Sequence, residues 1–290
     1  MATRTVSITS VMVESKVEEI VRFTIHQRIQ HILMIVSFTM LAFTGLPQKF
    51  NTWGVSEWWV NFLGGIEMVR NLHRFFAVVL LADAVYHIVY IFGGMAIRKQ
   101  PLPLSMIPSL KDFQGMYQEI RYFVGLSREE PQYDRFNWRE KFDYWAVFWG
   151  TPILGISGLI LMYPVQVTHF LPGQAVPMAM IAHSDEAFLA VAWIFGSHLF
   201  FTHLSPGVFP LNKSIFTGRI PVTRLQEEHP LEWKRIQAAL AVAQPEAVSV
   251  AVEAVPENII VPENIAVEAE LPGNPDALPK APNNPPNENA

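Results

Sequence analysis

Four stretches of the chain are apolar over nearly the length that a helix needs to cross a lipid bilayer. Such a helix takes about 20 predominantly apolar residues. The stretches run from Ile29 to Leu46, His73 to Gly93, Tyr144 to Tyr163 and Met178 to Leu204. This pattern predicts an all-α fold, an integral membrane four-helix bundle over residues 29–204.

Each apolar stretch is interrupted by polar side chains that lipid disfavours. Ionisable groups inside a membrane are costly unless they face a partner, so they rarely point at lipid. We therefore expect these side chains to point into the bundle. They are His31, His73, Asp83, His87, His183, Asp185, Glu186, His198 and His203.

Basic residues are unevenly divided between the segments that flank the stretches. Residues 1–28 carry four Lys or Arg, the loop 94–141 carries eight, and residues 213–235 carry five. The loop 47–72 carries two and the loop 164–177 carries none. Because cytoplasmic loops are enriched in Lys and Arg, we expect both termini in the cytoplasm and the protein in the inner, cytoplasmic membrane of the cell.

The composition shifts near the C-terminus to Ala, Val, Pro, Glu and Asn, and the sequence Val-Pro-Glu-Asn-Ile occurs twice there. Low-complexity polar composition of this kind predicts a disordered tail over residues 237–290. The expected organisation is a cytoplasmic segment 1–28, the membrane domain 29–204 with its cytoplasmic loop 94–141, an amphipathic cytoplasmic flank 205–236, and the tail.

Composition narrows the chemistry that the chain can carry. Half of its residues are apolar, the formal charge is -5, and there is no cysteine. The absence of cysteine excludes disulfides, thiolate metal sites, iron–sulfur ligation and thioether-bound haem on this chain. Nothing in the charge pattern indicates nucleic acid. We find no zinc-protease, P-loop or dinucleotide fingerprint either, so we expect a subunit of a complex and not an enzyme acting alone.

The histidines are the main functional signal. His73 and His87 are 14 residues apart and His183 and His198 are 15 apart. At 3.6 residues per turn each pair lies within about 60° of one helix face, with roughly 21 Å between its members. Two helices with histidines at two matching depths suggest two bis-histidine haem b groups, His73 with His183 and His87 with His198. His31 falls at the same depth as the latter pair, so three histidines compete there for two axial positions, and the spacing alone favours His87.

Several short sequences, taken in order, resemble a known family. It comprises the cytochrome b, or gamma, subunit of membrane-bound formate dehydrogenases, together with the b-type cytochromes of nickel–iron hydrogenases. The resembling pieces span residues 22–235. They are Arg28-Ile-Gln-His31, Thr44-Gly-Leu46, Arg70-Asn-Leu-His73, Arg135-Phe-Asn-Trp-Arg-Glu-Lys141, Ser157-Gly158, His183-Ser184, and His229-Pro230 followed by Trp233.

The resemblance implies a set of haem ligands that overlaps the one from spacing. The family's two ligand pairs correspond in this sequence to His73 with His183 and to His31 with His198. This sequence departs from the family pattern in two ways: the fourth-helix spacing is 15 and not 14, and His87 is an additional candidate. The choice between His31 and His87 therefore stays open, with a lean to His31, and the other histidine is expected near a quinone.

The resemblance also implies a function. A redox subunit at the outer face, an iron–sulfur protein or a multihaem cytochrome, would exchange electrons with the outer haem. The inner haem would exchange them with menaquinone or ubiquinone near the cytoplasmic surface. The alternative from another class is a haem-free proton or ion carrier that uses the buried His and Asp residues.

Three charged residues beside the histidines are further candidates. Arg70 and Arg74 flank His73, where their guanidinium groups would pair with haem propionates or simply anchor the helix at the interface. Asp83 precedes His87 by four residues and shares its helix face, so its carboxylate is expected to orient that imidazole or relay protons.

Overall fold

A computed structural model describes residues 18–99 and 104–240 of the chain. Four of its helical segments are long and apolar enough to cross a membrane: Ile25–Lys49, Ile66–Ile97, Trp138–Met162 and Ala175–Leu204. These segments overlap the four predicted stretches and extend beyond most of their ends. The prediction of an all-α integral membrane bundle is confirmed, and the protein is a multi-pass membrane protein.

The described elements follow one another in a simple order. In chain order they are β1 (Glu19–Val21), α1 (Ile25–Lys49), α2 (Gly54–Phe62), α3 (Ile66–Arg98), the 3-10 helix η2 (Leu104–Met106), α4 (Leu110–Phe123), α5 (Trp138–Met162), α6 (Pro164–Val167), α7 (Ala175–Trp193), the π-helices η3 (Ile194–His198) and η4 (Phe200–Leu204), α8 (Ser214–Thr217), β2 (Arg219–Pro221) and α9 (Val222–Glu228). A further helix covers residues 230–240. The first four residues of the predicted tail continue that helix, and the rest of the tail lies outside the described residues.

Polar capping residues set where two of the membrane helices begin. Thr24 caps α1 together with Gln27, and Asn137 caps α5 together with Glu140. In each capping box the first side chain binds the backbone N–H three residues on, and the later side chain binds back to the backbone N–H of the cap. These polar turns explain why both helices start earlier than their apolar stretches.

The membrane helices pack as two pairs, α1 along α3 and α5 along α7. Buried hydroxyl groups lie in these contacts without unpaired donors, because each donates to a carbonyl four residues earlier in its own helix. Ser37 donates to Leu33 and Thr44 to Met40, both at 2.7 Å. This local bonding lets small polar side chains bring helices close together inside a membrane.

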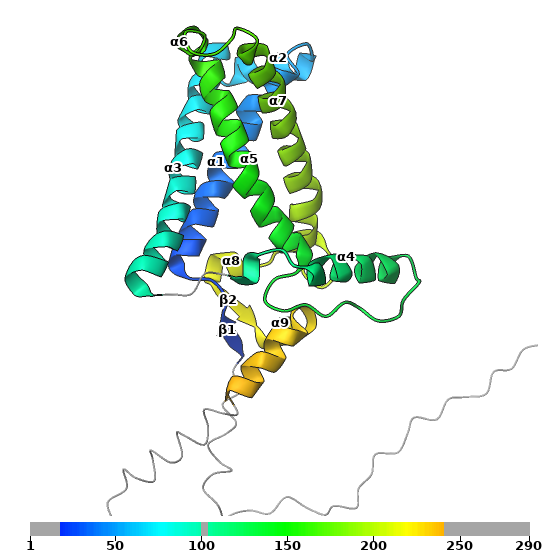
Figure 1. Cartoon of the computed structure of the whole chain (residues 1–290). Helices are drawn as coiled ribbons and strands as arrows, with labels where there is room; N and C mark the ends of the chain where they lie inside the picture. Colours follow the sequence, from blue (N-terminus) through cyan, green and yellow to red (C-terminus); the bar gives the residue numbers. More distant parts are fainter. Residues whose placement is uncertain (1–17, 100–103, 241–290) are drawn as a thin grey trace, which may run out of the picture. The chain divides into compact units, whose positions relative to one another are not determined.

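One end of the bundle carries a polar cap, which we define as residues 18–24, 133–137 and 211–240 (Figure 1). Strands β1 and β2 pair antiparallel there, with Ile20 opposite Ile220. Both ends of the described chain thus lie at this end of the bundle, as an even number of crossings requires. Helices α2 and α6 lie at the opposite end.

Four buried or half-buried polar groups hold the cap together. Arg22 forms an ion pair with Glu232 and a hydrogen bond with His229 at 3.0 Å, and Arg135 reaches the other oxygen of Glu232 at 2.8 Å. Burial, and then the nearby Arg22, lowers the pKa of His229 to about 4. The neutral ring donates from Nδ1 to the Asp134 carbonyl at 2.7 Å and accepts from Arg22 at Nε2.

Candidate functional site

Two pairs of histidines face each other across the two helix pairs. His73 of α3 faces His183 of α7 with 6.2 Å between ring centroids. His31 of α1 faces His198 of η3 with 6.4 Å between centroids. His73 lies in the second turn of α3 and His31 in the second turn of α1, and these helices start at opposite ends of the bundle. We call the two the α2-side pair and the cap-side pair.

His73 is held from behind by the helix that packs against α3. The Thr44 hydroxyl donates to the Met40 carbonyl, so its oxygen accepts from the His73 Nδ1–H at 2.9 Å. A methyl group on the adjacent Gly45 would lie 3.2 Å from the Cε1 atom of the ring. The hydroxyl thus fixes the tautomer, the glycine admits the ring, and Nε2 remains for a ligand bond.

The second helix pair repeats this arrangement around His183. Its Nδ1 lies 3.1 Å from the Ser157 hydroxyl and 3.1 Å from the Leu154 carbonyl. A methyl group on Gly158 would lie 3.2 Å from the Cε1 atom of His183. A hydroxyl residue followed by glycine therefore supports both rings of the α2-side pair, from α1 on one side and from α5 on the other.

The cap-side pair is held differently. The Asp143 carboxylate of α5 accepts from His198 Nδ1 at 2.7 Å, and its other oxygen accepts from the Trp193 indole at 2.6 Å. His31 Nδ1 is buried and has no hydrogen-bond partner within the described residues. A carboxylate behind an imidazole orients the ring and raises its basicity, so the two rings of this pair differ in their support.

A π-helix accounts for the unusual spacing on the fourth membrane helix. His198 is the last residue of η3, which directly follows α7. A π-turn bonds i to i+5 and so takes in one more residue per turn than an α-turn. The 15 residues from His183 to His198 therefore rotate about the helix axis by as much as about 14 residues of a regular α-helix would. His198 thus lies on the same face of the helix as His183.

The spacing of both pairs fits two imidazoles on opposite faces of one haem iron. An imidazole nitrogen binds a metal at about 2 Å, with the ring centroid roughly 1 Å behind it, so two such ligands put their centroids about 6 Å apart. In the described parts of the chain no group of three or more His, Asp or Glu side chains could hold a metal ion. A haem macrocycle supplies four ligands of its iron, so two histidines from the protein complete the set.

Residues 22–212 match the family model for prokaryotic cytochrome b561. The chain belongs to this family. It is 25% identical over 177 residues to the cytochrome b556(fdo) subunit of formate dehydrogenase from Escherichia coli strain K12, which covers 61% of this chain and 74% of the relative. It is 22% identical over 216 residues to the cytochrome b556 subunit of formate dehydrogenase from Haemophilus influenzae, with 74% and 82% covered.

Membership in the prokaryotic cytochrome b561 family makes the chain a b-type cytochrome, an electron-transfer subunit with haem b as its cofactor. The suspected resemblance to formate dehydrogenase cytochromes is confirmed by these comparisons. A cytochrome family does not favour the haem-free carrier, which was the alternative interpretation of the buried His and Asp residues.

His87 of this cytochrome does not face another histidine. Its Nδ1 lies 3.0 Å from the Gln30 side-chain oxygen, and its Nε2 lies 3.0 Å from the Tyr144 hydroxyl. Spacing alone had favoured pairing it with His198, but the structure brings His31 to that position. Because 14 residues fall about 40° short of four turns, His87 turns from the direction of His73 towards α1 and α5.

Asp83, one turn before His87, is only 5% exposed, and its Oδ1 has no hydrogen-bond partner within the described residues. The amide nitrogen of Gln30 is likewise buried without a partner there. Two polar groups therefore lie beside His87 with hydrogen-bonding capacity to spare, which is costly in a membrane unless a bound molecule or water uses it.

The two arginines of the site lie near the start of α3. Arg70 forms an ion pair with Glu67 at 3.1 Å, and both side chains are at least half exposed. Arg74 is exposed. Both flank His73 in the sequence, and their pairing with haem propionates stays a prediction.

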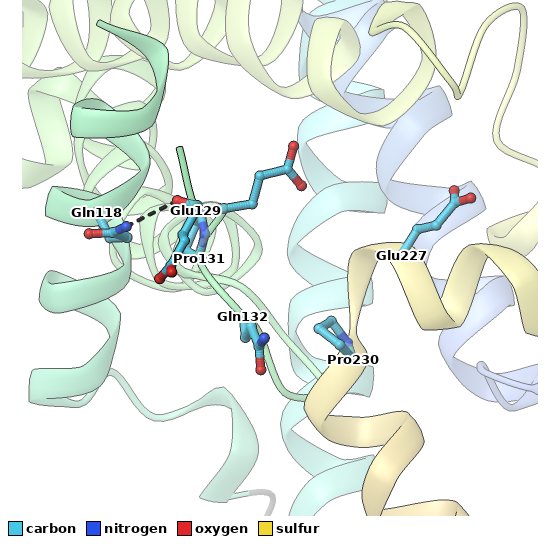
Figure 2. Close-up of a pocket in the computed structure, with 7 residues that line it drawn as sticks. Gln118, Glu129, Pro131, Gln132, Glu227 and Pro230 are labelled. Atoms are coloured by element: carbon cyan, nitrogen blue, oxygen red, sulfur yellow. Dashed lines mark hydrogen bonds between the residues drawn. The ribbon is translucent and has the colours of Figure 1, made fainter. Parts of the chain in front are cut away.

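A cavity of about 750 Å³ lies apart from the histidine pairs, between α4, the loop after it and α9 (Figure 2). Its lining includes Glu129, Glu130 and Glu227, with Gln118 of α4 donating to the Glu129 carbonyl at 3.0 Å. It contains no histidine, so we do not assign it to the electron-transfer site.

Proposed function

We propose that this chain is a di-haem cytochrome b that passes electrons across the membrane between a redox subunit and the quinone pool. The observation that carries the proposal is the presence of two facing histidine pairs at opposite depths of one bundle. His73 and His183 are the proposed ligands of one haem, and His31 and His198 those of the other. When bound, haem iron supplies the one-electron chemistry.

The hydrogen bonds support His31 over His87 as the fourth ligand. An axial imidazole needs one free ring nitrogen, and both nitrogens of His87 are occupied by Gln30 and Tyr144. The buried Nδ1 of His31 has no hydrogen-bond partner within the described residues, and the ring faces His198 at the required separation. We propose that His87 belongs to a neighbouring polar site instead.

The proposed quinone site is the polar cluster of Gln30, Asp83, His87 and Tyr144. Gln30 directly precedes His31, and Tyr144 directly follows Asp143, which supports His198. The cluster is therefore joined to both members of the cap-side pair. It offers a phenol, an imidazole, an amide donor and a carboxylate, which match the donors and proton acceptors that quinone reduction and oxidation require.

The proposed orientation puts the cap in the cytoplasm and the α2 end outside an inner cell membrane, because the basic residues lie at the cap end. The partner subunit, an iron–sulfur protein or a multihaem cytochrome, would then meet the α2-side pair. The curated relatives are named as subunits of formate dehydrogenase, which supports a place in a membrane complex of that kind. Quinone exchange at the cap side would complete a path across the bilayer.

Anaerobic addition of menaquinol or ubiquinol to the haem-loaded cytochrome in nanodiscs tests the quinone link. We expect at least one quinol to reduce the haem, with a rise of the reduced absorbance bands. Tyr144→Phe should slow this reduction several-fold at unchanged haem content, since it removes only the hydroxyl. Tyr163→Phe, which removes a hydroxyl at the α2 end, is the matched control. A cytochrome that holds its haems but is reduced by neither quinol would contradict this part of the proposal alone.

A further inference from the structure

Helix α4 has an apolar stripe that no described part of the chain covers. Its members lie three or four residues apart, which puts them on one face of a helix. They are between 52% and 80% exposed, although each is a large apolar or aromatic side chain. The stripe consists of Leu110, Phe113, Tyr117, Ile120 and Val124.

The opposite face of α4 is tied to the start of α5 by charged and aromatic groups. Lys141 pairs with Asp112 at 2.8 Å, and Glu119, which is only 7% exposed, accepts from Arg139 and from the Trp138 indole. Burial by itself would raise the pKa of Asp112, but the bonds from Lys141 and Ser109 outweigh it and lower that pKa. These contacts leave the helix no freedom to turn its stripe inwards.

The direction of the stripe follows from the loop that returns from α4 to α5. In Figure 1, α4 lies across the direction of the membrane helices, level with the start of α5, and the loop runs back on the side of α4 that is away from the bundle. Tyr133 of this loop contacts Gly115 and Glu119, so the face of α4 that is tied to the first turn of α5 also meets the returning loop. The stripe on the other face therefore points away from both the first turn of α5 and the returning loop, and its side chains are exposed.

We propose that α4 is an in-plane membrane helix, with its stripe buried among the lipids of the leaflet at the cap end. Amphipathic helices of this kind lie at the boundary of headgroups and acyl chains, about 5 to 10 Å deep. Helix α5, to which α4 is tied, also exposes large apolar side chains, as a helix that faces lipid does: Phe142 is 49% and Trp149 is 63% exposed. The Trp145 indole also binds the Met106 carbonyl at 2.8 Å, which keeps the approach to α4 against this lipid-facing helix.

The polar side of α4 fits contact with water. Gln118 lines the acidic cavity shown in Figure 2, together with glutamates of the following loop and of α9. The helix therefore separates lipid from an aqueous, acidic surface. It also anchors the first turn of α5, which lies just before Asp143, so lipid contact would fix the depth of the residue that supports His198.

Spin labelling of the full-length chain tests this proposal, and the lack of cysteine makes single-cysteine variants simple to label. We would label Phe113→Cys and Tyr117→Cys in nanodiscs of phosphatidylethanolamine and phosphatidylglycerol, with Lys111→Cys on the other side of α4 as the matched control. Haem content would verify that each variant folds. Power saturation with oxygen and with a water-soluble nickel chelate then reports lipid and water contact.

In lipid, labels at positions 113 and 117 should collide with the nickel complex several-fold less often than the label at 111, and with oxygen more often. Equal access of the nickel complex to all three positions would overturn the proposal. Shielding of 113 and 117 that appears only when a partner subunit is added would also overturn it, since the occupant would then be protein. Neither result depends on the quinone link.

Discussion

At the scale of residues, each proposed ligand pair combines a strict geometry with a different chemical support. Around the α2-side pair, hydroxyl and carbonyl oxygens receive the Nδ1 protons of His73 and His183. In the cap-side pair a full carboxylate, Asp143, receives that of His198. An imidazole bonded to a carboxylate is a more basic ligand, so it stabilises oxidised iron more strongly. The two haems should therefore differ in reduction potential.

Asp143→Asn should raise the reduction potential of one haem and leave the other unchanged. The amide keeps the size of the side chain but removes the charge that makes His198 a strong donor. A spectroelectrochemical titration of the purified cytochrome measures both potentials. Asp134→Asn, which removes an exposed carboxylate from the cap, should change neither. A shift of both haems by the same amount in Asp143→Asn would argue against this specific support.

Gly45→Ala and Gly158→Ala should each weaken haem binding by the α2-side pair. The new methyl group would lie 3.2 Å from the ring of His73 or His183, closer than ordinary packing allows. Overpacking of this kind costs about 1 to 3 kcal/mol. Haem retained after gel filtration at increasing temperature measures the effect. Gly93→Ala is the control, because its methyl group would have no neighbour within 4 Å in the described structure.

At the scale of elements, the apolar pattern predicted the four membrane helices because a stretch of nearly 20 predominantly apolar residues is typical of a membrane-spanning helix. It missed the first turns of α1 and α5, since Thr24 and Asn137 form polar capping boxes. The π-helix at His198 has one sign in the sequence, the extra residue between His183 and His198. The pairing of β1 with β2 has no such sign, because backbone hydrogen bonds join two segments that lie about 200 residues apart in the sequence.

The same limits explain the doubt over the cap-side ligand. Helical spacing relates His73 to His87 on one helix, but it does not say which neighbouring helix each ring meets. That depends on the packing of α1 against α3, which places Gln30 beside His87 and leaves His31 facing His198. The burial of His229 in the cap was likewise not foreseen, since its partner Arg22 lies 207 residues away.

The cap should lose stability as the pH falls from about 6.5 towards 4. His229 has a pKa of about 4 in the folded chain against 6.5 for an unperturbed histidine. Between these values the unfolded chain binds a proton that the folded chain does not, so acid favours unfolding. Hydrogen exchange of residues 219–235 as a function of pH measures this. His229→Gln keeps a donor and an acceptor but does not titrate, so it should flatten the dependence. An equal slope in both proteins would contradict the assignment.

At the scale of the whole molecule, two helix pairs present their histidines to each other across a common interior. The rings of His73, His183 and His198 are held by the helix beside their own, and all four rings face the opposite helix pair. A haem at either level would therefore join the two halves of the bundle. The pairs lie near opposite ends of helices long enough to span the bilayer. Electron transfer between them would therefore move charge through most of the membrane, with the quinone cluster at one end of the path.

Haem quantitation on three proteins tests the central claim most directly. The pyridine haemochrome of the purified wild type, His31→Ala and His87→Ala gives the number of haem b groups per chain. We predict two for the wild type, one for His31→Ala, and two for His87→Ala, because His87 is bonded to Gln30 and Tyr144 and not to iron. A folded wild type with a single haem, or a His87→Ala variant that loses one while His31→Ala keeps both, would contradict the account.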